Sequence, residues 1–143
     1  MSAGEHFEEI VENFELFDDW EERYRYVIEL GRGMPALPDE RRTAATKVDG
    51  CASQVWLVPE VRNSAEGPRL FFQGDSDAMI VRGLISILIS LISGRRLDEI
   101  RRLDIRGQLA RLSLDQALSS QRSNGLRAMV ARIEDIARAS QAA

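Results

Sequence analysis

The stretch from Met79 to Ile92 most constrains the fold, because as a helix it would be apolar around almost its whole circumference. A helix without a polar face has to be surrounded by other parts of the molecule. The longest apolar stretch, residues 83–92, is well short of the ~20 residues that a membrane span needs. We therefore predict a helix over residues 77–93 at the centre of a core, and no association with a membrane.

The remaining residues have to cover that helix. The chain has 143 residues, of which 44% are hydrophobic and 29% are charged. This length is typical of one domain, which buries roughly two-thirds of the surface of its unfolded chain without needing a disulfide or a metal. We predict a single domain over residues 1–143, with mobile ends at 1–4 and 139–143.

Two amphipathic helices are predicted ahead of the core helix, over residues 5–17 and 20–30. Their apolar residues recur at the helical spacing of three and four. Gly31 and Gly33 are expected to end the second helix, since Pro35 follows closely and prevents its continuation. Residues 34–45 are then expected to form a surface loop.

The periodicity changes in the middle of the chain. Residues 46–48 suggest a short strand, and the β-prone residues 54–61 a longer one. The turn-rich residues 63–68 include Gly67, which is the expected position of positive φ. A return strand over 69–73 would complete an antiparallel hairpin.

Capping residues define the helices that follow. Asp75 or Ser76 is expected to cap the core helix, because a side-chain oxygen there accepts backbone N–H bonds. Gly94 is expected to end it. Leucine spacing predicts two short helical turns next, and Ser123 or Asn124 is expected to cap the last helix. The order of helices, small antiparallel sheet and helices predicts an α+β fold.

Charge is distributed unevenly along the chain. There are 19 basic and 23 acidic residues, so the chain lacks the basic footprint of a nucleic-acid-binding protein. Residues 1–30 hold ten acids against two arginines, whereas residues 95–143 hold ten arginines against six acids. This asymmetry favours a protein partner met by distinct acidic and basic faces. The alternative is two solvated helix faces.

The counts of cysteine and histidine exclude several classes of protein. Cys51 is the only cysteine and His6 the only histidine. An internal disulfide is therefore impossible, and the ligands of a zinc site are absent. A Cys–His catalytic pair would have to use His6, near the end of the chain. The acidic beginning of the sequence does not resemble a secretory signal, so we expect a cytoplasmic location.

Cys51 follows the turn signal of Asp49 and Gly50, which would present its thiol on a loop. A lone cysteine is commonly an inert, buried residue, and this alternative stays open. A lone loop thiol without a base or a resolving cysteine also suits a sulfur acceptor. Such a thiolate takes the terminal sulfur of a partner's persulfide, and no second thiol in the chain discharges it as a disulfide.

Four blocks of sequence together resemble the SufE family of sulfur-acceptor proteins. They are residues 20–37, 50–56 (GCASQVW), 73–84 (QGDSDAMIVRGL) and 122–129 (RSNGLRAM). The blocks occur in the order and spacing of the family, and the resemblance covers residues 14–138.

The resemblance implies a function. SufE-like proteins accept persulfide sulfur from a SufS-type cysteine desulfurase, stimulate it, and deliver the sulfur to the SufBCD scaffold for iron–sulfur cluster assembly. The acceptor maps onto Cys51, and Ala52 stands where better-known members often have Gln. Such a protein is not itself an enzyme and has no cofactor of its own, since the pyridoxal phosphate belongs to the desulfurase. The implied fold is α+β, like that of IscU-type scaffolds.

The same resemblance suggests residues that shape the cysteine loop or contact the partner. Asp75 and Asp77 map near the start of the core helix, where helix capping is the alternative role. Arg122 would bind loop backbone or the desulfurase, with a solvated side chain as the alternative. The full expected set is Cys51 as acceptor, with Gly50, Ser53, Gln54, Asp75, Asp77 and Arg122 around it.

A persulfide exposed to water is lost to other thiols, so we expect Cys51 to be substantially buried on a loop that opens for its partner. Two alternatives remain at this stage. One is a one-cysteine thiol redox enzyme such as a peroxidase, which needs a low-pKa thiolate. The other is an interaction module in which Cys51 is inert. We expect the protein to be a monomer or a weak dimer.

Overall fold

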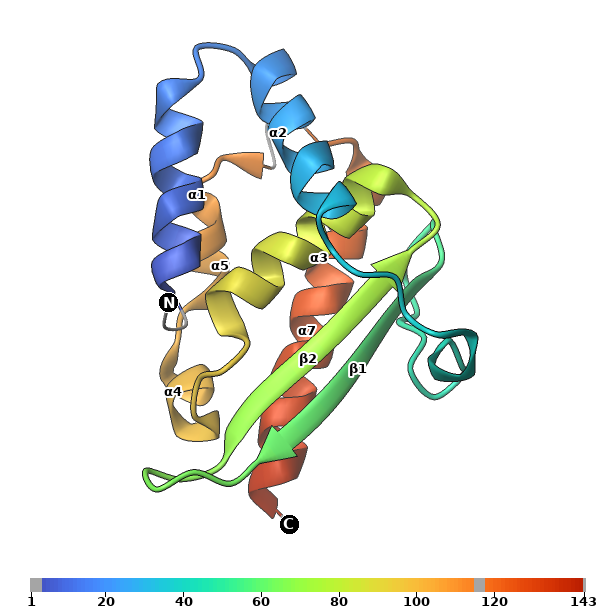
Figure 1. The fold of residues 1–143 in the computed structure, drawn as a ribbon, viewed down its shortest axis with the longest axis vertical. Helices are drawn as coiled ribbons and strands as arrows, with labels where there is room; N and C mark the ends of the chain where they lie inside the picture. Colours follow the sequence, from blue (N-terminus) through green and yellow to red (C-terminus); the bar gives the residue numbers. More distant parts are fainter. Residues whose placement is uncertain (1–3, 115–117, 143) are drawn as a thin grey trace.

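The computed structural model describes residues 4–114 and 118–142 (Figure 1). Of the ends that were expected to be mobile, residues 1–3 and 143 lie outside this part of the chain. Gly4 precedes the first helix, and residues 139–142 belong to the last one.

The predicted core helix is confirmed as α3, Met79–Ile92, with nine of its 14 residues buried. The first two helices and the β-hairpin pack against it, and α7 passes behind the hairpin (Figure 1). A helix with apolar residues on every side needs such cover, because each exposed methylene would forfeit about 0.8 kcal/mol of burial. The α+β architecture predicted from the order of elements is therefore confirmed.

Helices α1 (Glu5–Leu16) and α2 (Trp20–Arg32) form an antiparallel pair beside α3. Of the two glycines predicted to end α2, Gly33 is its C-cap, whereas Gly31 lies inside the helix. Its role is close packing: a Cβ there would lie 2.7 Å from the backbone nitrogen of Gly83 in α3. The chain then turns into residues 33–45, which contain one short 3₁₀ turn, Asp39–Arg41.

Strands β1 (Val55–Arg62) and β2 (Arg69–Ser76) form the antiparallel hairpin, with Val55 opposite Ser76. Gly67 has the expected positive φ, 126°, at the turn. The short strand expected at 46–48 is only a single bridge, from Lys47 to Trp56.

The predicted start of the core helix needs correction. The strand β2 runs on through Asp75 and Ser76, and neither residue occupies the cap position of α3, although the hydroxyl of Ser76 accepts from the backbone N–H of Ala78 at 3.2 Å. Ala78 occupies the cap position and makes no side-chain capping bond. The carboxylate of Asp75 is unavailable because it lies buried in contact with the loop after α2, as described below. Asp75 therefore acts as a link between elements rather than as a cap.

After α3, Gly94 takes a φ of 95° and turns the chain as expected. Two short helices follow, α4 (Leu97–Arg102) and α5 (Ile105–Ala110), and α7 (Ser120–Ala142) ends the fold. The prediction that Ser123 or Asn124 caps the last helix is wrong, since α7 begins earlier at Ser120. The side chain of Ser123 is buried within the helix.

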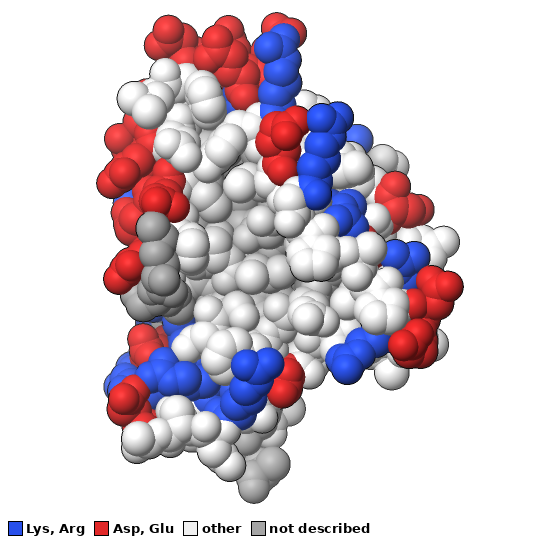
Figure 2. Space-filling view, viewed as in Figure 1, with Lys and Arg blue, Asp and Glu red and all other residues white. Residues whose placement is uncertain are grey.

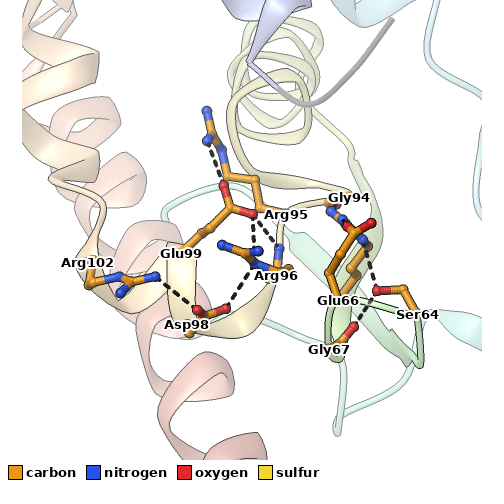
Figure 3. A network of polar contacts seen from close by, with 10 residues as sticks. Ser64, Glu66, Gly67, Gly94, Arg95, Arg96, Asp98, Glu99 and Arg102 are labelled. Carbon is orange, nitrogen blue, oxygen red and sulfur yellow. Dashed lines mark hydrogen bonds and ion pairs between the residues drawn. The ribbon is translucent and has the colours of Figure 1, made fainter.

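Polar contacts join the tip of the hairpin to the turn before α4 (Figure 3). Arg69 at the start of β2 donates to the carbonyl of Gly94 at 2.9 Å and pairs with Glu66. Asp98 accepts from Arg102 at 2.9 Å and lies 3.2 Å from Arg96. The far end of the hairpin is thereby fixed against α4.

Candidate functional site

Cys51 lies on the loop that leads into β1, and its side chain rests against α7. Gly50 before it has a φ of 89°, which favours glycine. The thiol donates to the carbonyl of Gly125 at 3.7 Å. A small cavity of about 100 Å³ surrounds it, lined also by Leu84 of α3 and Met129 of α7. The thiol therefore faces a small space with both apolar and polar lining, the latter including Ser53 and Arg122.

The expected sheltering of Cys51 is present to an intermediate degree, because its side chain is half-buried rather than fully covered. Burial raises the pKa of the Cys51 thiol, and the negative charge of Asp49 raises it further. A raised pKa means that the thiol is predominantly protonated near neutral pH, which slows its reaction with small oxidants and alkylating reagents.

Asp77 fixes the end of the cysteine loop where it enters β1. Its carboxylate accepts a hydrogen bond from the backbone N–H of Gln54 at 3.0 Å. Its own backbone N–H donates to the carbonyl of Gln54 at 3.3 Å. Among the described residues, the side chains of Gln54 and Ser53 form no hydrogen bond. Gln54 thus contributes to the cysteine loop through its backbone bonds to Asp77, and Ser53 contributes by lining the cavity.

Arg132 of α7 holds the other end of the loop, and sequence reasoning missed it. Its guanidinium donates to the carbonyl of Ala45 at 2.7 Å and to that of Lys47 at 3.3 Å. Nothing in the sequence distinguished it from the other arginines of α7, because its partners lie more than 80 residues away. Asp77 and Arg132 hold the two ends of the loop, and buried Val48 is bonded to Val55 at 2.8 Å, so residues 49–53 are the segment between the fixed points.

Arg122 lies at the cavity of Cys51, in the first turn of α7. Its Nη1 donates to the hydroxyl of Tyr24 in α2 at 2.5 Å. Arg122 was expected to bond to the backbone of the cysteine loop, but among the described residues its guanidinium bonds to Tyr24 instead. Tyr24 is a second residue that sequence reasoning missed, since it matched the apolar stripe of α2.

Asp75 does not lie at the cavity of Cys51. It is 1% exposed, and it accepts from the backbone N–H of Leu37 at 3.0 Å, from Arg42 at 2.7 Å, and from Arg82. Burial raises its pKa, but the N–H groups of Leu37 and Ser76 and the two arginines outweigh that effect and hold its pKa below the usual range. Asp75 therefore anchors the loop after α2 to the sheet.

The chemistry open to this site is that of one thiol. No group of three or more metal-ligating side chains occurs among the residues that the structure describes. The fold and site thus define a small α+β protein that carries a single half-buried thiol on a loop with both ends fixed. Arg122 is the only cation that lines the cavity of the thiol within the described chain.

Comparison with known proteins gives the family. The model of the SufE family, described as an Fe–S metabolism associated domain, matches residues 8–137. A SufE-like protein of Rhizobium meliloti is 50% identical over 127 residues, which cover 89% of this chain and 91% of the relative. One of Rhizobium etli is 51% identical over 136 residues, covering 95% and 92%. The chain belongs to the SufE family.

A solved structure supports the fold. The solution structure of a hypothetical protein from Thermus thermophilus superposes with a TM-score of 0.75 over the whole of both chains, at 16% identity. Within the described residues, no helix is long and apolar enough to cross a membrane.

Proposed function

We propose that this protein carries sulfur for iron–sulfur cluster assembly, with Cys51 as the acceptor. A SufS-type cysteine desulfurase would supply the sulfur and a SufBCD scaffold would receive it. The family places the chain in iron–sulfur metabolism. The observation that carries the proposal is the lone thiol of Cys51, half-buried beside a small cavity on a loop fixed at both ends.

The transfer step balances without an added oxidant or reductant. The Cys51 thiolate attacks the terminal sulfur of the partner's cysteine persulfide. The bond between the two partner sulfurs breaks, and the partner's cysteine leaves as a thiolate that takes up the proton released by Cys51. The product is a persulfide on Cys51, ready for attack by an acceptor on the scaffold. No cofactor of this chain enters the step, because pyridoxal phosphate acts earlier, on the desulfurase.

The geometry requires the loop to change conformation. In its present position the thiol faces α7, and Gly125 lies directly against it. A partner must bind the open conformation more tightly than the closed one in order to populate it. The raised pKa of Cys51 in the closed position would then fall when the thiol leaves its half-buried position and becomes solvated.

This reading accounts for the site better than the two alternatives. A thiol peroxidase needs a thiolate with a lowered pKa, whereas burial and Asp49 raise the pKa of Cys51. An interaction module with an inert cysteine would not need the loop bonds of Asp77 and Arg132 around that cysteine. We expect the carrier itself to be a cytoplasmic monomer or weak dimer.

The decisive experiment is an intact-mass spectrum, recorded without reductant, after incubation with a SufS-type desulfurase and L-cysteine. The expected result is a gain of one or more sulfur atoms that is absent in Cys51→Ser. The same variant should bind the desulfurase but fail to stimulate its turnover. An unmodified mass together with unchanged desulfurase turnover would contradict the proposal.

A further inference from the structure

A groove lies on the other side of α3 from the cysteine site. Val81 and Leu84 of α3 face the cavity of Cys51, whereas Ser86 and Ile89 form the floor of the groove. Its main hollow has a volume of about 680 Å³ and continues into another of about 420 Å³ that shares the same floor. Uncharged residues form the centre of this face, and charged side chains surround it (Figure 2).

One wall of the groove is the outer edge of β2. The backbone groups of Val55 and Leu57 in β1 bond to the 46–48 segment, so the alternate residues of β1 bond to β2. By the register of the hairpin, Phe72 and Gly74 of β2 then direct their backbone groups away from β1 and toward the groove.

Part of this edge is already bonded, and part lacks hydrogen-bond partners among the described residues although both Phe72 and Gly74 are buried. Leu70 exchanges hydrogen bonds with Gly94 and Arg95, and the N–H of Phe72 donates to Ser93 at 3.2 Å. The carbonyl of Phe72 and both backbone groups of Gly74 have no hydrogen-bond partner in the described part of the chain. An open strand edge is a template for pairing with another extended chain, and folds usually cover it.

The opposite wall of the groove supplies apolar contacts for the side chains of a peptide bound along this edge. It is formed by the end of α2 and by residues 33–38, with Leu30, Met34 and Pro35 lining the groove. An added strand places alternate side chains on one face, and here that face meets Ile89 and Leu30. The groove therefore offers both backbone partners and apolar contacts along the same line.

A positive charge at the end of the groove favours a peptide that carries a carboxylate. Arg41 lines the groove beside Phe72 and Gln73. Its guanidinium forms no hydrogen bond or ion pair with the described residues. Nearby Glu60 is paired with Arg62, which is the main cause of the lowered pKa of Glu60, and the charge of Arg41 contributes only the smallest part. An arginine without a bonded carboxylate at the end of a strand edge fits the carboxylate of an incoming chain.

We infer that this groove binds an extended, apolar segment of a partner protein, which joins β2 as an added strand and pairs a carboxylate with Arg41. The inference goes beyond the proposed function, because the groove and the cavity of Cys51 use different faces of α3. One partner can occupy the groove while the thiol serves another, which is what a carrier with a donor and a recipient requires.

The test uses a displayed library of short random peptides, selected on the full-length protein. Enriched peptides should alternate apolar residues and carry Asp or Glu near one end. Ile89→Arg and Arg41→Glu should each weaken binding about tenfold or more, and a lysine in place of the peptide's acid should restore binding to Arg41→Glu. Val61→Arg, on the far edge of the hairpin, is the matched control and should bind like the wild type.

Amide hydrogen exchange supplies a readout at the strand edge itself. Bound peptide should slow the exchange of the Gly74 amide about tenfold or more, and proline at the paired peptide position should abolish this protection. Peptides that bind equally well to Ile89→Arg, unchanged exchange at Gly74, or occupation of the groove by a second copy of this chain would overturn the inference.

The sulfur-loading assay separates this inference from the proposed function. Ile89→Arg and Arg41→Glu should accept sulfur on Cys51 from the desulfurase as the wild type does. Loss of loading in the wild type would refute the carrier proposal and leave the peptide result standing. Loss of loading only in the two groove variants would mean that the groove serves the desulfurase, which would overturn its independence from the cysteine site.

Discussion

At the scale of single residues, the thiol of Cys51 is held in a state that favours storage over reaction. Burial is the larger cause of its raised pKa, and Asp49, two positions earlier, is the smaller one. A thiol kept in this state reacts slowly with small oxidants. Under the proposed function, a partner that draws the loop out would supply the activation that the isolated chain lacks.

This account predicts that Asp49→Asn makes Cys51 more reactive. Removing the carboxylate charge lowers the pKa of Cys51, so the alkylation rate should reach half of its maximum at a lower pH than in the wild type. Iodoacetamide kinetics between pH 6 and pH 10, a range chosen around the ordinary thiol pKa of about 8.5, measure this shift. Asp135→Asn, far along α7, is the control and should leave the profile unchanged. A profile that Asp49→Asn does not move would refute the electrostatic account.

At the scale of elements, the crossing of α2 and α3 depends on two glycines. A Cβ on Gly83 would lie 2.1 Å from the carbonyl oxygen of Val27, and one on Gly31 would lie 2.8 Å from that of Met79. The two backbones thus approach more closely than side chains permit. This contact fixes α2 over the core helix, and with it the residues that border the groove.

We predict that Gly83→Ala destabilises the fold by about 3 kcal/mol, because the added methyl group forces the two helices apart. Chemical denaturation monitored by circular dichroism measures this change. Gly33→Ala is a matched control: its added Cβ would meet only ordinary contacts, at 3.7 Å and beyond, so its stability should remain close to that of the wild type. Equal effects of the two substitutions would contradict the role of the crossing.

At the scale of the whole molecule, the acidic beginning and the arginine-rich end of the chain meet in the fold. The carboxylate of Glu8 in α1 accepts from both terminal nitrogens of Arg111, at 2.7 and 2.8 Å, across 103 positions of sequence. The hydrogen bond with Arg111 is the main cause that lowers the pKa of Glu8. Some of the uneven charge is therefore neutralised within the molecule.

A double-mutant cycle with Glu8→Gln and Arg111→Met should show a small favourable coupling at low salt. The coupling should fade in about 1 M salt, where the Debye length falls to about 3 Å. Because the folded state lowers the pKa of Glu8, the coupling should be complete above the pKa of Glu8 in the unfolded chain. It should vanish as the pH falls through the lower pKa of the folded state. A coupling that persists in acid or in high salt would contradict an ionic origin.

Much of the architecture could be predicted from local patterns. The apolar run of α3, the turn at Gly67 and the α+β order each follow from composition over a few residues. The errors share one cause. Asp75 and Ser123 look like caps because local rules assign short polar residues to helix ends, but long-range contacts bury both of them instead. Such contacts leave no mark in a short window of sequence.

The candidate site, too, was predictable from the sequence only in part. The sequence by itself determined that a single thiol, Cys51, follows a turn, and that the chain holds no second thiol. Only the tertiary structure decided that Arg132 and Asp77 fix the two ends of its loop, and that Arg122 points to Tyr24. It also decided that the edge of β2 at Phe72 and Gly74 lines a groove beside Arg41. The physical reason is that chemical identity is a property of one residue, whereas burial, pairing and reach depend on neighbours that only the folded chain brings together.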